Sequence, residues 1–203
     1  GKDEIWIALK NKNVYGKSGP RILLWFDLIN SPDGQVPMGS KVTMSQNPQF
    51  IVRAAGSFRQ NEGCADESVD SLSPERLEYL CAGECYNPSN EREVIEKIEI
   101  IKITPQVYAG EAISPLIQDP WKSIPCQGIG ECIVEFEDQN FSRDSVYYVR
   151  AIQHHTLAIN GSPLSQGDNF ELCKGSFRTD LADDCLSMTN ERAWSSPIYI
   201  DKP

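Results

Sequence analysis

The sequence predicts a mainly β protein, an antiparallel β-sandwich with a short N-terminal helix and a disulfide-tied insertion of loop and helix. Six or seven short segments have strand character, and long polar connections separate them. The seven cysteines lie in stretches rich in Gly, Asp and Pro rather than in apolar strands. Hydrophobic residues make up 40% of the 203 positions, which is enough for a sandwich core and too many for a disordered chain.

The strongest predicted strand is residues 21–28, which follow the turn Tyr15-Gly16-Lys17-Ser18-Gly19-Pro20. Its apolar residues fall on both faces, as in a central strand, and Pro20 prevents a helix from continuing into it. Period-two alternation or β-branched residues predict the remaining strands. These strands are residues 41–44, 49–55, 98–103, 132–137, 145–153 and 193–200.

Two short helices are predicted. Residues 3–12 carry Ile, Trp, Ala and Leu at helical spacing, so this helix needs a partner for its apolar face. Residues 73–81 form the second helix, with Ser73 as its cap, inside an insertion at 60–90.

Two further regions are predicted to be irregular. Residues 105–131 contain four prolines, and residues 154–192 form a second insertion that is too polar and glycine-rich for much core.

The balance of charge excludes two classes of partner. The net charge is −10, and the isoelectric point is near 4.7. Binding to nucleic acid or to an anionic membrane surface requires clustered lysine and arginine, so neither is expected. The longest apolar run, residues 22–26, is far shorter than the ~18–20 residues of a membrane span.

The cysteines favour disulfides in an oxidising compartment, and hence a secreted or periplasmic protein. The spacings are Cys81-x3-Cys85, Cys126-x5-Cys132 and Cys173-x11-Cys185, and none matches the paired CxxC of a zinc ribbon. A bond between Cys173 and Cys185 is expected to tie the 154–192 insertion, and the sequence leaves the connectivity of the other cysteines open. Metal binding and free thiols remain as alternatives. The number is odd, so at least one sulfur is free or pairs outside this chain. The candidates are Cys64, Cys81, Cys85, Cys126, Cys132, Cys173 and Cys185.

Four groups of segments, in this order, carry a family resemblance that covers nearly the whole chain. They are Ile5-Trp6-x-Ala-Leu with Val14-Tyr15-Gly16-x-Ser18-Gly19-Pro20-Arg21; Pro37-Met38-Gly39-Ser40; Asp119-Pro120-Trp121-Lys122 with Val134-Glu135-Phe136-Glu137-Asp138 and Val146-Tyr147-Tyr148-Val149-Arg150-Ala151; and Glu191-Arg192-Ala193-Trp194-Ser195-Ser196-Pro197-Ile198. Together they resemble the C-terminal region of a large, mostly uncharacterised branch of the PHP (polymerase-and-histidinol-phosphatase-type) metal-dependent phosphoesterase superfamily.

The resemblance implies a domain organisation. In that family a distorted β/α barrel holds the metal site, a helix similar to residues 3–12 ends the barrel, and an immunoglobulin-like sandwich follows. By this resemblance residues 1–20 are the terminal helix and turn of the barrel, and residues 21–203 are the sandwich. The chain has no His-x-His motif, and His154 and His155 are its only histidines, so it cannot assemble the superfamily's metal cluster.

Candidate chemistry in the chain itself is sparse. By resemblance, Tyr15, Ser18 and Arg21 lie near the barrel's mouth and could line its active site; the alternative is that they only shape and pack the turn. No catalytic residue and no metal ligand are predicted here. The two histidines are adjacent and point to opposite sides of an extended chain, so they do not share one metal. The acids Glu135, Glu137 and Asp138 lack the pattern of a calcium loop and are expected to be solvated.

Two functions are therefore expected. The first is the non-catalytic sandwich portion of a secreted or periplasmic PHP-type hydrolase, which packs on a barrel and completes the mouth of a metal site held there. Its divalent metal would belong to the barrel, and its partner would be that barrel or another chain of an assembly. The alternative is an independent extracellular binding or structural module in a larger assembly.

Overall fold

The computed structural model describes residues 1–81, 85–128, 130–159 and 186–203. The chain divides into two compact units. The first unit comprises Gly1–Ser57, Glu93–His154 and Glu191–Pro203, and the second comprises Phe58–Arg92 and His155–Asn190.

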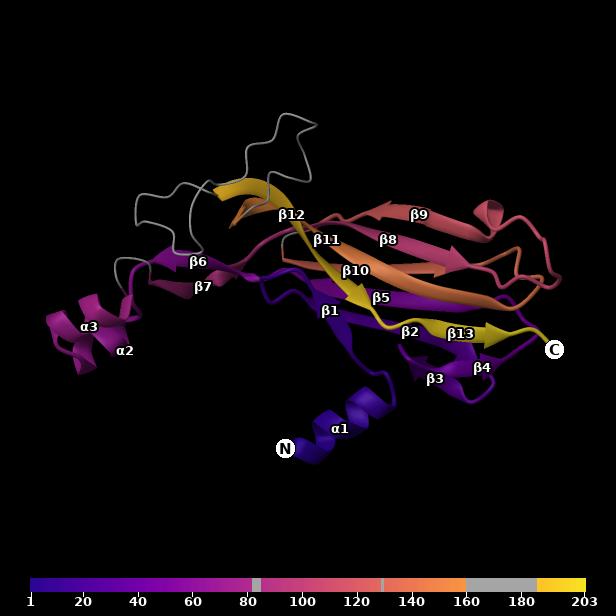
Figure 1. Ribbon diagram of the computed structural model, residues 1–203, viewed down its shortest axis with the longest axis horizontal. Helices are drawn as coiled ribbons and strands as arrows, with labels where there is room; N and C mark the ends of the chain where they lie inside the picture. The colour runs from indigo at the N-terminus through magenta and orange to yellow at the C-terminus, as the bar shows by residue number, and fades with distance from the viewer. Residues whose placement is uncertain (82–84, 129, 160–185) are drawn as a thin grey trace. The chain divides into compact units, whose positions relative to one another are not determined.

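The first unit contains two sheets that pack face to face (Figure 1). The larger sheet has the order β1-β12-β11-β13-β4, with β8 also paired to β11 and β9 paired to β8. Its strands are β1 (Tyr15–Lys17), β12 (Leu186–Ser195), β11 (Ser145–Ile159), β13 (Ile198–Asp201), β4 (Lys41–Thr43), β8 (Ile95–Ile103) and β9 (Ile117–Pro125). The smaller sheet has the order β10-β5-β2-β3, with β10 (Glu131–Glu137), β5 (Gln49–Ala55), β2 (Leu23–Ser31) and β3 (Gly34–Pro37).

The prediction of a mainly β protein with antiparallel sheets is confirmed. Every pairing of the smaller sheet is antiparallel, as are β1 with β12, β11 with β8 and β13, and β8 with β9. One pair, β13 with β4, runs parallel. The predicted strand at 21–28 is a central strand, since β2 lies between β5 and β3.

Aromatic rings fill the space between the two sheets. Phe26, Phe50 and Phe136 come from three neighbouring strands of the smaller sheet, and their ring centres lie 4.9–6.4 Å apart. Tyr147 reaches them from β11 of the larger sheet, with its ring centre 4.8 Å from that of Phe50. Trp121 of β9 meets Phe136 edge-on at 6.3 Å. The alternation of each strand therefore places one ring on the inner face. There the packing of ring against ring stabilises the core beyond the burial of apolar surface alone.

The prediction that residues 105–131 are irregular is wrong over β9. This strand contains Pro120 and Pro125, and the Asp119–Pro120 peptide bond is cis. Prolines are tolerated because β9 is an edge strand: among the described strands it pairs with β8 alone, so the missing N–H groups of its prolines need no second neighbour. The register shifts between Ile100 and Lys102, the part of β8 opposite Pro120.

Two other boundaries differ from the prediction. Residues 193–200 form the end of β12 and the whole of β13, separated at Ser196 and Pro197. The insertion predicted at 154–192 is shorter, because β11 continues to Ile159 and β12 begins at Leu186. Pairing of backbone groups outweighs the polar composition there. Cys173 and Cys185 lie outside the described residues.

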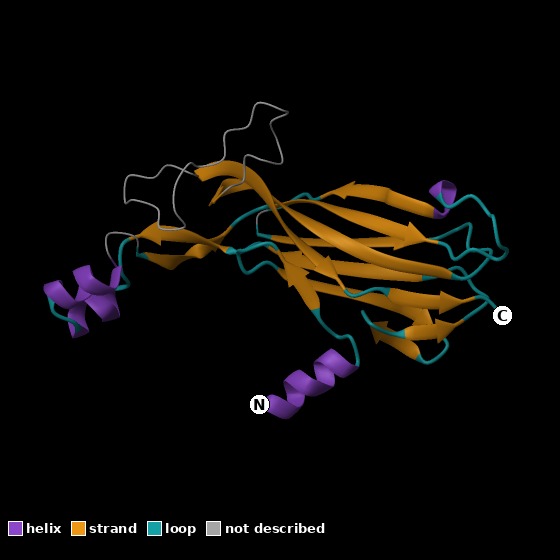
Figure 2. Cartoon of the chain, viewed as in Figure 1, coloured by secondary structure: helices purple, strands orange, loops and turns teal. Residues whose placement is uncertain are grey.

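In the second unit, the predicted insertion at 60–90 forms a β-hairpin whose connection contains two short helices (Figure 2). Strands β6 (Phe58–Glu62) and β7 (Tyr86–Arg92) pair antiparallel, and α2 (Asp66–Ser71) and α3 (Pro74–Cys81) lie between them in sequence. The predicted helix at 73–81 is confirmed, with the Arg76 N–H donating to Ser73 Oγ at 3.3 Å. The hairpin was not predicted because its strands contain no β-branched residue.

The predicted N-terminal helix is confirmed as α1 (Lys2–Lys10), and a short 3₁₀ helix, η1 (Ser114–Leu116), precedes β9. The end of α1 is fixed to the sandwich by three contacts. Asn13 Nδ2 donates to the Met38 carbonyl at 2.7 Å, and Lys12 Nζ lies 5.0 Å from the ring centre of Tyr199. Gly39 has a φ of +91° and packs against the backbone of Lys12. A Cβ at this position would lie 2.5 Å from the Lys12 carbonyl oxygen.

A side chain at Gly39 should therefore disturb the anchor of α1. We expect Gly39→Ala to lower the free energy of unfolding by at least about 1 kcal/mol more than Gly34→Ala. Gly34 is a matched control, because its φ of +92° imposes the same backbone strain but nothing lies within 4 Å of its Cβ position. Urea denaturation of the two variants measures the difference, and equal losses would contradict the contact.

Candidate functional site

The turn at residues 15–21 is held by hydrogen bonds at both ends. Tyr15–Lys17 forms β1 at one edge of the larger sheet and pairs with β12, so the sandwich begins before the predicted strand. The Tyr15 hydroxyl donates to the Ile22 carbonyl at 3.1 Å. Lys17 Nζ donates to the Gly19 carbonyl at 2.7 Å. These bonds close the turn upon itself and hold Tyr15 beside the start of β2.

Ser18 ties this turn to a buried carboxylate on β12. Its backbone N–H donates to the Arg192 carbonyl at 3.0 Å, and its Oγ accepts from the Arg192 N–H at 2.9 Å. The Ser18 hydroxyl donates to the carboxylate of Glu191, which is only 6% exposed. A buried carboxylate needs such a donor to offset its lost hydration.

The three residues predicted to line an active site have different surroundings. The hydroxyls of Tyr15 and Ser18 are used within the turn and its attachment to β12. Arg21 lies exposed where the turn meets β2. A lining role for these residues toward another domain stays a prediction. His154 and His155 are both exposed on β11.

A second polar cluster, which the sequence did not reveal, lies at the edge of the core. Lys102 of β8 forms an ion pair with Asp138, and the Tyr147 hydroxyl donates to the same carboxylate at 2.5 Å. The Asn140 N–H donates to the other oxygen at 3.1 Å. Asp138 is 1% exposed, so the expectation that it is solvated is wrong.

The protonation of this cluster follows from its partners. Burial alone would raise the pKa of the Asp138 carboxyl, but the hydrogen bonds from Lys102, Tyr147 and the Asn140 backbone together lower it. Burial and the neighbouring Asp138 raise the pKa of the Tyr147 hydroxyl. Asp138 is therefore the acceptor and Tyr147 the donor at neutral pH.

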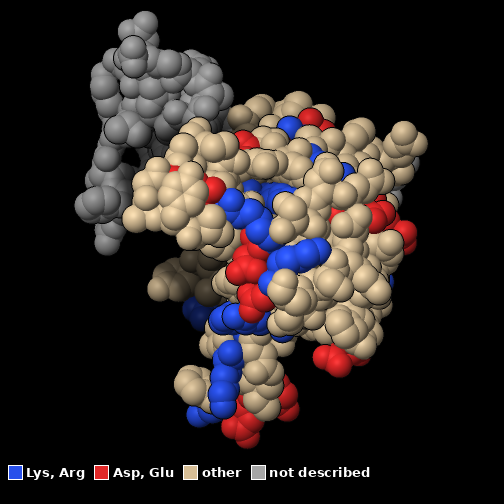
Figure 3. Space-filling model, turned by 90° about the vertical axis from the view of Figure 1, so that its right-hand side faces the viewer, with Lys and Arg blue, Asp and Glu red and all other residues tan. Residues whose placement is uncertain are grey.

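A pocket of about 370 Å³ opens beside this cluster. Its lining includes Lys102, Asp138, Trp121, Asn140 and Arg143. Arg143 forms a two-pronged ion pair with Glu111, and its hydrogen bond lowers the pKa of that carboxyl to about 2. Figure 3 shows basic and acidic side chains interspersed in a column from the centre of the face it presents to its lower end, rather than gathered by sign.

The expectation of disulfides is confirmed among the described residues, where Cys81 pairs with Cys85 and Cys126 pairs with Cys132. Cys64 is a free thiol in the described part of the chain. Its sulfur lies with those of Cys81 and Cys85 in one cluster, where all three are within 4.8 Å of one another. Within the residues that the structure covers, this is the one group of three or more potential metal ligands so close together.

No family model, no curated protein and no solved structure matches this chain. None of the described helices is long and apolar enough to cross a membrane.

The hydroxyl of Ser18 should stabilise the attachment of the turn. Ser18→Ala leaves the buried Glu191 carboxylate without this donor, so we expect a loss of about 1–3 kcal/mol in the free energy of unfolding. Chemical denaturation measures it, and Ser142→Ala, at an exposed loop position, is the control. A loss no larger than that of the control would show that the bond to Glu191 contributes nothing.

The Asp138 cluster should make stability depend on acid pH. The pKa of Asp138 is lower in the folded chain than the ~3.9 of an unfolded aspartate, so its contribution is complete above that value and is lost as pH falls through the folded pKa.

Asp138→Asn should therefore lower stability at pH 7 by several kcal/mol, because Lys102 stays buried without its acid. It should also flatten the fall in stability as the pH drops below about 4, the ordinary pKa of an aspartate. Thermal denaturation at neutral pH and across that acidic range measures both effects, with Asp33→Asn at an exposed turn as control. An unchanged slope would contradict this account of Asp138.

Proposed function

We propose that this chain is the immunoglobulin-like sandwich portion of a secreted or periplasmic PHP-type metal-dependent hydrolase, and that it is not catalytic alone. In this proposal α1 and the turn at 15–21 pack on a barrel that holds a divalent metal, and Arg21 faces the mouth of that site. The family assignment rests on the order of the segments that resemble the superfamily, and the docking surface rests on the structure of α1.

The observation that carries the docking proposal is the exposed apolar face of α1. Ile5, Trp6 and Leu9 share one side of the helix and are 65%, 67% and 56% exposed. Ile7, on the opposite side, is 55% exposed, and the helix has no buried residue. Full burial of such side chains stabilises by about 1.5–3 kcal/mol each. A nine-residue helix is marginal by itself in water, so its stability depends on covering that face.

The attachment of α1 supports a docking role over that of a loose tail. The segment directly after the helix is fixed to the sandwich by Asn13 and by the close approach of Gly39 to Lys12. The turn that follows is fixed by Ser18 to Glu191. These contacts hold the segment that carries α1 in one position. Less conformational entropy is therefore lost when another domain covers the apolar face of the helix.

The experiment uses the protein expressed from the complete reading frame that contains this chain. We expect it to carry a divalent metal, measured by inductively coupled plasma mass spectrometry, and to hydrolyse a chromogenic phosphoester. Trp6→Glu should lower the activity at least tenfold, because a charge replaces an anchor of the interface. Tyr79→Glu, on the exposed face of α3, is the matched control and should leave the activity unchanged.

Two outcomes would contradict the proposal. The first is a reading frame without a histidine-rich metal domain. The second is a dimer of this chain in light scattering that Trp6→Glu converts to monomer, which would favour the independent extracellular module. A metal-bound protein in which Trp6→Glu leaves activity unchanged would keep the family assignment and remove the docking role of α1.

A further inference from the structure

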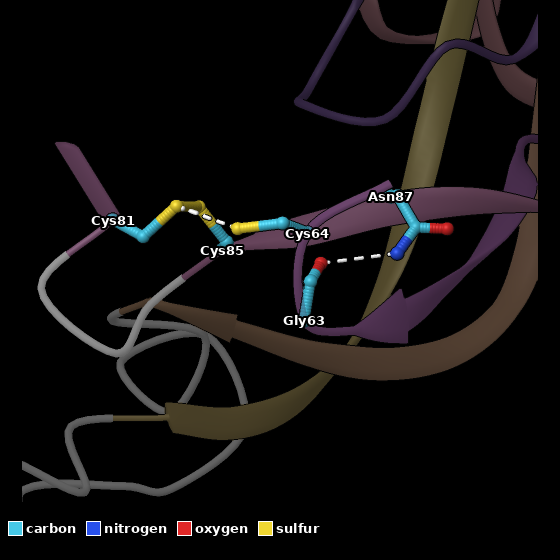
Figure 4. Close-up of a disulfide and its surroundings, with 5 residues drawn as sticks. All are labelled: Gly63, Cys64, Cys81, Cys85 and Asn87. Carbon is cyan, nitrogen blue, oxygen red and sulfur yellow. Dashed lines mark hydrogen bonds between the residues drawn. A yellow bond between two sulfur atoms is a disulfide. The ribbon is translucent and has the colours of Figure 1, made fainter. Parts of the chain in front are cut away.

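Three sulfur atoms meet at the end of the β6–β7 hairpin where the connection between the two strands begins (Figure 4). Glu62 at the end of β6 pairs with Tyr86 at the start of β7. The Gly63 N–H donates to the Cys85 carbonyl at 2.8 Å, and Asn87 Nδ2 donates to the Gly63 carbonyl at 3.0 Å. These bonds continue the hairpin by one residue on each side, so Cys64 and Cys85 are held near each other by backbone pairing.

Cys81 reaches the same place from the end of α3, whose first turn is fixed by Ser73. It is bonded to Cys85, with their Cα atoms 5.0 Å apart. The thiol sulfur of Cys64 lies 2.8 Å from the sulfur of Cys81. All three residues are half-buried, so solvent and small reagents reach them.

We propose that Cys64, Cys81 and Cys85 form a thiol–disulfide exchange site in which Cys81 is the shared sulfur. The Cys64 thiol loses its proton to solvent, and the thiolate attacks the Cys81 sulfur. The Cys64–Cys81 bond forms, the Cys81–Cys85 bond breaks, and Cys85 leaves as a thiolate that takes up a proton. One disulfide and one thiol are present before and after, so the step needs no oxidant or reductant.

The geometry favours attack at Cys81. The Cys81 sulfur lies 2.8 Å from the Cys64 thiol sulfur, so the thiolate can reach it without a rearrangement of the backbone. The two disulfides would connect different parts of the second unit. The Cys81–Cys85 bond joins residues four positions apart in sequence. A Cys64–Cys81 bond would join residues 17 positions apart and would connect the end of β6 to the end of α3.

The exchange moves a reactive thiol from one side of the hairpin to the other. In one isomer the thiol is on Cys64, just after β6, and in the other it is on Cys85, just before β7. The odd number of cysteines ensures that at least one sulfur of the chain has no partner within it.

Peptide mapping of the full, unreduced chain tests the exchange. The thiols are blocked with N-ethylmaleimide at acidic pH, which stops further exchange, and the chain is then cut with trypsin. Cleavage after Arg59, Arg76 and Arg92 places Cys64 on one peptide and Cys81 with Cys85 on the next. We expect two species: an internal disulfide in the second peptide with Cys64 alkylated, and a cross-link between the two peptides with Cys85 alkylated.

Two variants separate the isomers. Cys64→Ser should give only the internal Cys81–Cys85 disulfide, with no alkylation in the cluster. Cys85→Ser should give only the Cys64–Cys81 cross-link. The disulfide between Cys126 and Cys132 is the folding control and should be retained in both variants.

Several results would overturn the proposal. One is a single pairing in the unchanged chain, and another is Cys85→Ser with both remaining cysteines alkylated. A bond from Cys64 to Cys173 or Cys185 would also overturn it. So would one zinc ion per chain that protects all three thiols from the reagent, since three thiolates are also a zinc ligand set.

Discussion

The contact between Phe50 of the smaller sheet and Tyr147 of the larger sheet joins the core to the polar parts of the first unit. The Tyr147 ring packs on Phe50 at 4.8 Å, while its hydroxyl donates to Asp138 at 2.5 Å. Asp138 in turn holds Lys102, whose ammonium group lies 5.4 Å from the ring centre of Trp121. The apolar packing and the polar cluster are therefore one structure. Since breaking a buried ion pair leaves an uncompensated charge, a change at either place is transmitted to the other.

Much of the sandwich could be predicted from the sequence, because alternation along a strand reports burial on one face. Residues 49–55 and 132–137 became β5 and β10 for that reason, and residues 21–28 were recognised as β2 from their continuous apolar run. Strand β9 and the β6–β7 hairpin could not be predicted, because backbone pairing with a neighbour decides them and their own residues disfavour strands. The role of Asp138 was missed for a related reason: its burial depends on Lys102, 36 residues away, and no local pattern marks the pair.

The candidate site was predicted only in outline. The turn at 15–21 was recognised from its glycines and proline, but Glu191, which Ser18 contacts, is 173 residues away in sequence. Tyr15 and Ser18 have structural hydrogen bonds, so of the three residues proposed by resemblance Arg21 is the one whose exposed side chain is best placed to reach another domain. The apolar pattern of residues 3–12 predicted that α1 needs a partner, and its exposed face agrees with that need.

The central claim is that another domain of the same protein covers the apolar face of α1. Hydrogen exchange at the amides of α1 tests it most directly, measured in this 203-residue chain and in the protein from the complete reading frame. A short helix that is covered on no side opens readily, so we expect fast exchange in the chain alone and exchange slowed at least tenfold in the larger protein. Equal exchange rates in the two proteins would contradict the claim.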